Sequence, residues 1–331
     1  MKKKILSLVM AVCMAATALT GCGQAKTEAE PENTASENTA PENELPEKVV
    51  FTYVTAPLNV PTIVEKEKGI FANALKELGV DVEYAELTSG ADQTQALASG
   101  DVQVLYAVGA TSVILSAAND ADIKVLNMYS RSPKAFCLYS QDEKITSPED
   151  LRGKTIACTT GTNLHELLVS YLKTADMTLE DVNYVDMTIP EAKAALDGDS
   201  VDAALLAGAT AYQAKQQGYH LVTDGEGLID AIIAVAVTDE FYNQYPEVIE
   251  RLKSAQEEVE GFIKDNKEEA MKIVANTLDL DVAAVEEMYG YYDFSTEITK
   301  EDKKGFQETA DFMFEAGMIE KELDVNTLFY E

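Results

Sequence analysis

Residue types that usually build catalytic and metal sites are scarce in this 331-residue sequence. It has no tryptophan, three arginines and two histidines, and His165 and His220 lie too far apart to suggest a zinc site. No HExxH, GxSxG or P-loop motif and no full GxGxxG fingerprint is present. We therefore expect no metal, no cofactor and no catalytic residue, and the chain is not predicted to be an enzyme.

Positive charge is also scarce. The sequence holds 26 Lys and Arg against 58 Asp and Glu, which gives a formal net charge of −32. Nucleic-acid surfaces and polybasic membrane-binding segments both require clustered positive charge. The composition therefore excludes a broad nucleic-acid interface and electrostatic attachment to anionic lipid.

Cysteine is limited to four positions, and no CxxC pair occurs. Cys137 and Cys158 both lie in apolar, strand-like runs, which favours buried free thiols. A disulfide between them stays open as an alternative, because sequence does not give the geometry that such a bond needs.

The N-terminus has the pattern of an export signal. Lys2 to Lys4 precede an apolar run over residues 5–19, which is too short for a permanent membrane anchor. The following Leu19-Thr20-Gly21-Cys22 resembles the lipobox of bacterial lipoproteins. This resemblance implies a signal peptide over 1–21, cleavage before Cys22 and lipidation of its thiol.

Residues 22–47 are predicted to tether the lipidated cysteine to a folded domain. The stretch after Cys22 has no aromatic residue and a single leucine, so it cannot bury enough apolar surface to become ordered. We expect an extracytoplasmic protein that contacts the cell membrane through its lipid anchor only.

From residue 48 the sequence alternates strand and helix patterns, which is typical of parallel βαβ units in an α/β protein. Helices are predicted at 61–78 with a break near Gly69, and at 91–99, 110–119, 162–175, 190–197 and 209–217. Strands are predicted at 48–55, 80–87, 102–108, 123–130, 136–140, 154–160, 182–187, 201–207, 219–223 and 230–238. From residue 239 onward the pattern is almost wholly helical.

An internal echo indicates two related lobes. Residues 96–111 (ALASGDVQVLYAVGAT) and 195–210 (ALDGDSVDAALLAGAT) align without a gap, and both end in Gly-Ala-Thr. Each would supply a helix end, a turn, an apolar strand and the start of a helix. Two α/β lobes in tandem predict a cleft between them, lined by the loops that follow the strands.

These loops are small, polar and rich in glycine. Loops of this kind follow the predicted strands at 55–59, 88–90, 109–112, 159–163 and 208–210. Glycine admits close approach to the backbone, and helix N-termini favour anions. Arg131, beside the expected lobe crossover, could add a bidentate donor, and His165 could add a hydrogen bond.

A set of short motifs resembles a known family. Residues 67–71 (EKGIF), 96–101 (ALASGD), 151–157 (LRGKTIA), 161–162 (GT) and 198–204 occur in the order found in the sulfonate/nitrate/taurine family of ABC-transporter substrate-binding proteins, which includes thiamine-pyrimidine binders. The resemblance covers about 48–260. It implies a two-lobed periplasmic-binding-protein type II fold, with two mixed sheets flanked by helices, two crossover hinge segments and a helical C-terminal tail.

The resemblance also implies domain limits and a site. Lobe one would comprise 48–132 plus 238–331, and lobe two 133–237. The chain has no tryptophan, and the aromatic or basic anchors that some members use are not evident here. Together the loops and the family pattern give this set of candidate ligand-binding residues: Leu58, Asn59, Ser89, Gly90, Gly109, Ala110, Thr111, Ser112, Arg131, Thr160, Gly161, Thr162, Asn163, His165, Gly208 and Thr210.

The expected function is capture of a small molecule by hinge closure, followed by delivery to an ABC permease with its ATPase. The chain is expected to act as a monomer. A small organosulfonate or similar oxyanion is favoured as ligand, with a neutral heteroaromatic such as a thiamine-pyrimidine precursor as the alternative. An enzyme on the same fold and a sensory protein that presents ligand to a receptor stay open as other classes.

Overall fold

The computed structural model describes residues 45–87 and 89–330. The expected signal peptide, the lipidation site at Cys22 and most of the expected tether lie outside these residues. Within them, no helix combines the length and the apolar character that a membrane crossing requires.

Lobe one is built on a mixed sheet. β1 and β2 pair in parallel, β10 lies between β3 and β4 and runs antiparallel to both, and a Phe51–Val104 bridge links β1 to the chain entering β3. The strands are β1 (Lys48–Thr52), β2 (Asp81–Ala85), β3 (Leu105–Gly109), β4 (Lys124–Arg131) and β10 (Ile232–Val237).

Lobe two is built on a five-stranded sheet in the order β7-β6-β8-β5-β9. β6 is parallel to β7 and β8, whereas β5 is antiparallel to β8 and β9. Both sheets are therefore mixed, as the family resemblance implied. The strands are β5 (Phe136–Ser140), β6 (Thr155–Cys158), β7 (Asn183–Asp186), β8 (Ala203–Ala207) and β9 (His220–Asp224).

The position of β10 differs from the expected boundary, which assigned residues 133–237 to lobe two. β10 is the central partner of β3 and β4, so it belongs to the sheet of lobe one. Val235 packs into the core on one face of this sheet, and Ala234 packs into the core on the other. An apolar run predicts a strand buried on both faces, but it does not indicate which sheet receives that strand.

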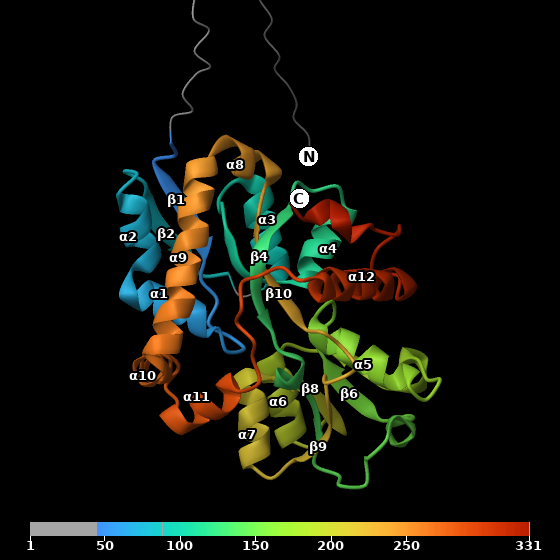
Figure 1. Cartoon of the computed structure of the whole chain (residues 1–331). Helices are drawn as coiled ribbons and strands as arrows, with labels where there is room; N and C mark the ends of the chain where they lie inside the picture. The colour runs from blue at the N-terminus through green and yellow to red at the C-terminus, as the bar shows by residue number, and fades with distance from the viewer. Residues whose placement is uncertain (1–44, 88, 331) are drawn as a thin grey trace, which may run out of the picture. The chain divides into compact units, whose positions relative to one another are not determined.

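Helices cover both faces of each sheet (Figure 1). In lobe one, the core on one face includes residues of α1, α2, α9 and α10, and the core on the other includes residues of α3, α4 and α12. These helices are α1 (Val60–Lys68), α2 (Ile70–Lys76), α3 (Gly90–Ser99), α4 (Ala110–Ala118), α9 (Pro246–Asp265), α10 (Lys267–Leu278) and α12 (Lys300–Glu315).

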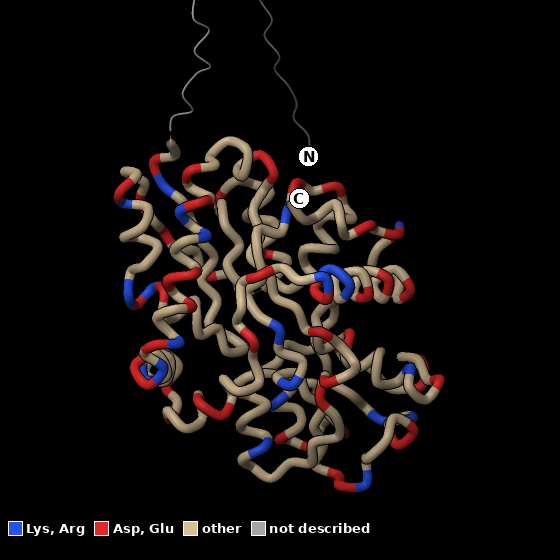
Figure 2. Tube along the Cα trace, in the orientation of Figure 1, with Lys and Arg blue, Asp and Glu red and all other residues tan. Residues whose placement is uncertain are grey.

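In lobe two, α5 packs into one core, and α6 and α7 pack into the other. Their bounds are α5 (Asn163–Lys173), α6 (Ile189–Asp197) and α7 (Gly208–Gln216). The remaining elements are α8 (Asp239–Gln244), α11 (Val282–Tyr289), η1 (Pro133–Ala135), η2 (Pro148–Leu151), η3 (Leu179–Asp181) and η4 (Val325–Leu328). Acidic residues are spread along the helices and loops of both lobes rather than gathered in one place (Figure 2).

Two local predictions depend on glycine and on the internal echo, and the structure confirms both. Gly69 has a φ of +65° and ends α1, which separates it from α2 as the broken helical pattern indicated. The two echoed segments occupy equivalent places, since each runs from a helix end (α3 or α6) through a strand (β3 or β8) into a helix (α4 or α7).

The tail adds a third chain segment where the lobes join. Besides the connections from β4 to β5 and from β9 to β10, residues 293–296 run beside the end of β4. Arg131 and Asp293 exchange backbone hydrogen bonds of 2.8 and 2.9 Å, and the Met128 N–H donates to the Thr296 carbonyl at 3.1 Å. Farther along the same strand, Val125 bridges Phe329 near the C-terminus.

Cys137 and Cys158 are buried free thiols, as their apolar surroundings predicted. Burial raises the pKa of Cys137 to about 12, so its thiol stays protonated at neutral pH.

Candidate functional site

The loop after β1 is held by Asn59, which is 4% exposed. Its side-chain amide donates to the carbonyls of Val54 and Ala56 at 2.9 and 3.1 Å, so it fixes the loop that leads into α1. The side chain of Leu58 is fully buried in the lobe-one core among residues such as Phe51. From this loop, the backbone rather than the Leu58 side chain is therefore left to face a ligand.

The loops after β2 and β3 lie against each other. A Cβ added to Gly90, the first residue of α3, would come within 2.0 Å of the Ser112 hydroxyl in the first turn of α4. Ser89 accepts a hydrogen bond from the Asp92 N–H and caps α3. The structure therefore brings Ser89, Gly90 and Ser112 together, and only glycine fits at position 90 without displacing Ser112.

The N-terminus of α4 has no side-chain cap. Its N-cap residue is Gly109, which has no side chain, and the adjoining Ala110 and Thr111 are 1% and 3% exposed. The first N–H groups of a helix have no partner within that helix. Because no side chain in 45–87 or 89–330 caps them, they are available to bind an anion.

The N-terminus of α7 in lobe two also lacks a side-chain cap among the described residues, and it touches lobe one. Its N-cap is Ala207, with no side-chain cap, and the Thr210 hydroxyl turns back to donate to the Ala207 carbonyl at 2.8 Å. Gly208 has a φ of +56°, and a Cβ there would lie 2.1 Å from the carbonyl oxygen of Pro57. The loop after β1 and the start of α7 thus meet across the lobes.

The loop between β6 and α5 is organised by hydrogen bonds within lobe two. The Thr160 N–H donates to Asp186 at 2.9 Å, and the Thr160 hydroxyl lies 2.5 Å from the Tyr184 hydroxyl. Thr162 caps α5 by accepting from the Leu164 N–H. The N–H of Thr160 and the hydroxyl of Thr162 are therefore already engaged.

His165 and Asn163 are buried at the start of α5, at 6% and 5% exposed. The Nδ1 atom of His165 accepts from the Gly161 N–H at 3.3 Å, so its proton is on Nε2, which is buried and has no partner among the described residues. Burial lowers the pKa of His165, against an opposing effect of Asp186. With Nδ1 engaged by the Gly161 N–H, the Nε2–H is left as a hydrogen-bond donor.

Helix α12 covers α5 from the lobe-one side. The Thr309 hydroxyl donates to Glu166 at 2.9 Å, and the ring of Phe312 lies edge-on to His165. Burial, with smaller contributions from Asp230 and Glu308, raises the pKa of Glu166 to about 7 against the lowering effect of the hydrogen bond from Thr309. This is a second place where the lobes touch.

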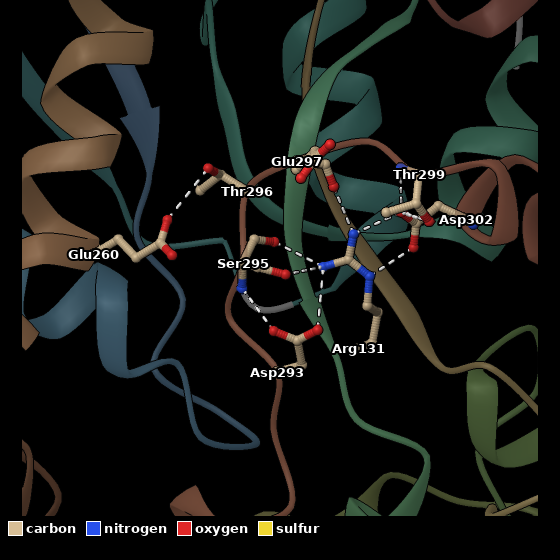
Figure 3. Close-up of polar contacts among 8 residues, drawn as sticks. All are labelled: Arg131, Glu260, Asp293, Ser295, Thr296, Glu297, Thr299 and Asp302. Atoms are coloured by element: carbon tan, nitrogen blue, oxygen red, sulfur yellow. Dashed lines mark hydrogen bonds and ion pairs between the residues drawn. The ribbon is translucent and has the colours of Figure 1, made fainter. Parts of the chain in front are cut away.

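Arg131 has a different role from the predicted one. Its Nε and Nη2 atoms donate to the two Asp302 oxygens at 2.6 Å each, and its remaining N–H groups bind the oxygens of Ser295 and the Glu297 carbonyl (Figure 3). All five donors are engaged, so none is left for a ligand. Arg131 instead fixes the 293–296 segment and the start of α12 to the end of β4.

Sequence reasoning missed several residues of this region. Tyr184 and Asp186 contact Thr160 in the loop at 159–163. Thr309 contacts Glu166 of α5, and Pro57 lies against Gly208. Only Pro57 lies inside a predicted loop and could have been selected. The other three lie on elements whose own patterns indicate nothing about the site.

Comparison with known proteins identifies relatives of this chain. It is 27% identical over 269 residues to a protein of Bacillus subtilis (strain 168) described as "Putative aliphatic sulfonates-binding protein", covering 80% of this chain and 81% of the relative. The crystal structure of the periplasmic aliphatic sulphonate binding protein SsuA from Escherichia coli matches with a TM-score of 0.78 at 20% identity. The match covers 87% of this chain and 93% of SsuA.

The same fold also occurs in an enzyme. The desulfurization enzyme DSZB matches with a TM-score of 0.64 at 14% identity, covering 86% of this chain and 96% of the enzyme. Structural likeness at this identity establishes the two-lobed fold alone. The family assignment comes from the sequence: the family model described as "NMT1/THI5 like" matches residues 57–270, more than half of the chain, and the protein therefore belongs to this NMT1/THI5-like family.

Proposed function

We propose that this protein is the extracytoplasmic substrate-binding component of an ABC importer, and that it captures a small organosulfonate or a similar oxyanion between its lobes. The observation that carries the proposal is the pair of uncapped helix N-termini, α4 in lobe one and α7 in lobe two, at equivalent places in the two lobes. Related proteins described as sulfonate-binding support the same ligand class.

Binding of an oxyanion at these positions requires no basic side chain. Backbone N–H groups supply the donors, and the helix dipoles favour negative charge. The Ser112 hydroxyl and the Nε2–H of His165 supply two further donors on the two lobes. A sulfonate has three acceptor oxygens, which matches several donors that approach from different directions.

The loop at Pro57 already lies against Gly208, where any larger residue would collide, and in this proposal the closed state keeps that contact. In this proposal the closed protein docks to a membrane permease with its ATPase, and a lipid on Cys22 holds the monomer at the membrane. The proposed ligand contacts are the loops at Asn59, Ser89–Gly90, Gly109–Ser112, Thr160–His165 and Gly208–Thr210.

The test is a thermal-shift and calorimetric screen of the chain carrying Cys22→Ser, with taurine, ethanesulfonate, nitrate, benzoate and a pyrimidine. A ligand that binds only the folded state raises its stability by about 2.7 kcal/mol at a hundredfold excess over Kd. We expect a selective shift with ethanesulfonate or taurine, and the compound recovered unchanged.

The matched variants are Gly109→Phe and Gly261→Phe. Gly109 has a φ of −66°, and a Cβ there would only reach Thr111 Oγ1 at 3.6 Å, so the larger residue fits the backbone but obstructs the start of α4. Gly261 lies on α9 with nothing within 4 Å of an added Cβ. Binding should be lost in the first variant and kept in the second. Chemical conversion of the ligand, or equal binding by both variants, would contradict the proposal.

A further inference from the structure

A cavity of about 380 Å³ lies on the α9 side of the lobe-one sheet, apart from the loops described above. Its walls are the end of α9, the 289–296 segment and the strands β3 and β4. The Thr296 hydroxyl donates to Glu260 of α9 at 3.4 Å, and Arg131 holds the same segment from its other side (Figure 3). The volume lies within the range of small-molecule sites.

Aromatic rings line this cavity as a continuous series. Tyr106 lies edge-on to Tyr129, which lies edge-on to Phe294, with centroids 5.1 and 6.0 Å apart. Phe294 in turn stacks on Tyr289 and Tyr292. A flat apolar ring could stack on these rings or meet them edge to face, the two arrangements that aromatic pairs prefer.

Buried polar groups of the cavity wall lack partners. Tyr106 and Gln256 are each 3% exposed. The Gln256 oxygen accepts from Asn127, which leaves the Gln256 NH₂ group free, and neither this group nor the Tyr106 hydroxyl bonds to any residue in 45–87 or 89–330. The Tyr292 hydroxyl is also buried without a partner. Buried polar groups are normally paired, so the Tyr292 hydroxyl implies a missing partner, and the Tyr106 hydroxyl and the Gln256 NH₂ group are two further donors of the wall.

All three groups can donate, and the cavity lining also holds two lysines and two carboxylates, which differ in their partners. Lys264 and Lys267 are exposed at the mouth and form no ion pair with the part of the chain that the structure describes. By contrast, Glu260 is bound by Thr296, and Asp293 accepts from the Ser295 N–H. An acceptor-rich, negatively charged group suits this arrangement better than a cation.

We infer that this cavity is a second ligand site that takes a small aromatic acid, with its ring among Tyr106, Tyr129 and Phe294 and its acidic group held by donors of the wall and mouth. The site is separate from the proposed oxyanion site between the lobes. Because one wall is the segment that Arg131 fixes at the hinge, occupancy would stabilise that segment against α9.

The experiment titrates 2-naphthoate into the chain carrying Cys22→Ser by calorimetry, with saturation-transfer NMR to detect contact with the ring. The expected result is one saturable site. Tyr106→Phe and Gln256→Leu should each weaken binding about tenfold, because each removes a hydrogen bond to a charged ligand. The control Tyr171→Phe, a buried tyrosine of lobe two, should leave binding unchanged.

Three outcomes would overturn the inference: no saturable binding, binding that is unaffected by both cavity variants, and binding that is abolished by Gly109→Phe. The last would place the probe between the lobes. The proposed function fails separately, since a chain that binds 2-naphthoate in the cavity but no sulfonate or other oxyanion would refute that function and keep the second site.

Discussion

Replacing Arg131 by methionine tests whether the hinge contact stabilises the fold. The side chains of Arg131 and Asp302 are 17% and 4% exposed, so the change leaves a buried carboxylate without its charged partner. Loss of one member of a buried ion pair costs about 3–5 kcal/mol. Because the N–H and hydroxyl of Thr299 still bind Asp302 at 2.7 Å, we expect the lower end, about 3 kcal/mol.

Such a loss should lower the Tm by about 6–10 °C in a chain of this size. Urea unfolding followed by circular dichroism at pH 7.5 measures it. Arg251→Met is the matched control: its pair with Glu77 is exposed (44% and 66%), so its loss should cost about 1 kcal/mol or less.

The double variant Arg131→Met with Asp302→Leu should recover part of the loss, since it leaves no unpaired buried charge. If Arg131→Met lowers the free energy of unfolding no more than Arg251→Met does, the contact between Arg131 and Asp302 does not stabilise the fold. Equal losses in the single and double variants would also show that the buried carboxylate is not the cause.

Three further predictions concern pH, lobe contact and anchoring. Burial raises the pKa of Glu65 and of Glu166 from 4.5 to about 7. The unfolded chain therefore loses these protons at lower pH than the folded chain does, and the free energy of unfolding should fall between about pH 4.5 and 7. The double variant Glu65→Gln with Glu166→Gln should flatten the change of the urea midpoint from pH 5 to 7.5, and a pH dependence equal to that of the unaltered chain would count against these two groups. Gly208→Val should weaken ligand binding at least tenfold in calorimetry, because its side chain collides with Pro57; wild-type affinity would mean that this contact is not part of closure. Cys22→Ser should move the protein from the membrane to the soluble fraction, and membrane retention would refute the lipid anchor.

Much of the fold could be predicted from local patterns. The first strand (predicted at 48–55, found at 48–52), the break at Gly69 and the repeated helix–strand–helix segments each depend on residues close together in sequence, such as a glycine that adopts a positive φ. The loops of the candidate site were predictable for a related reason. Once the strands are predicted, their carboxyl ends are also known, and the loops that follow those ends are where ligands bind in open α/β sheets.

The rest depends on pairings between distant residues. Arg131 meets Asp302, 171 residues later, and no local pattern around Asp302 marks it as a partner. The placement of β10 between β3 and β4 likewise depends on which sheet has room for a strand buried on both faces. The aromatic cavity combines Tyr106, Gln256 and Tyr292 from three separate parts of the chain, so only the folded structure could reveal it.

The contacts that the C-terminal segments make with β4 have a consequence for self-association. β4 is the last strand of its sheet, and an open edge strand is a template on which another chain can add a strand. Residues 293–296 occupy one end of this edge, and Phe329 bridges Val125 near the other. The tail therefore covers the open edge of β4. A chain cut before residue 290 would leave this apolar strand exposed, and copies of the chain could pair through it.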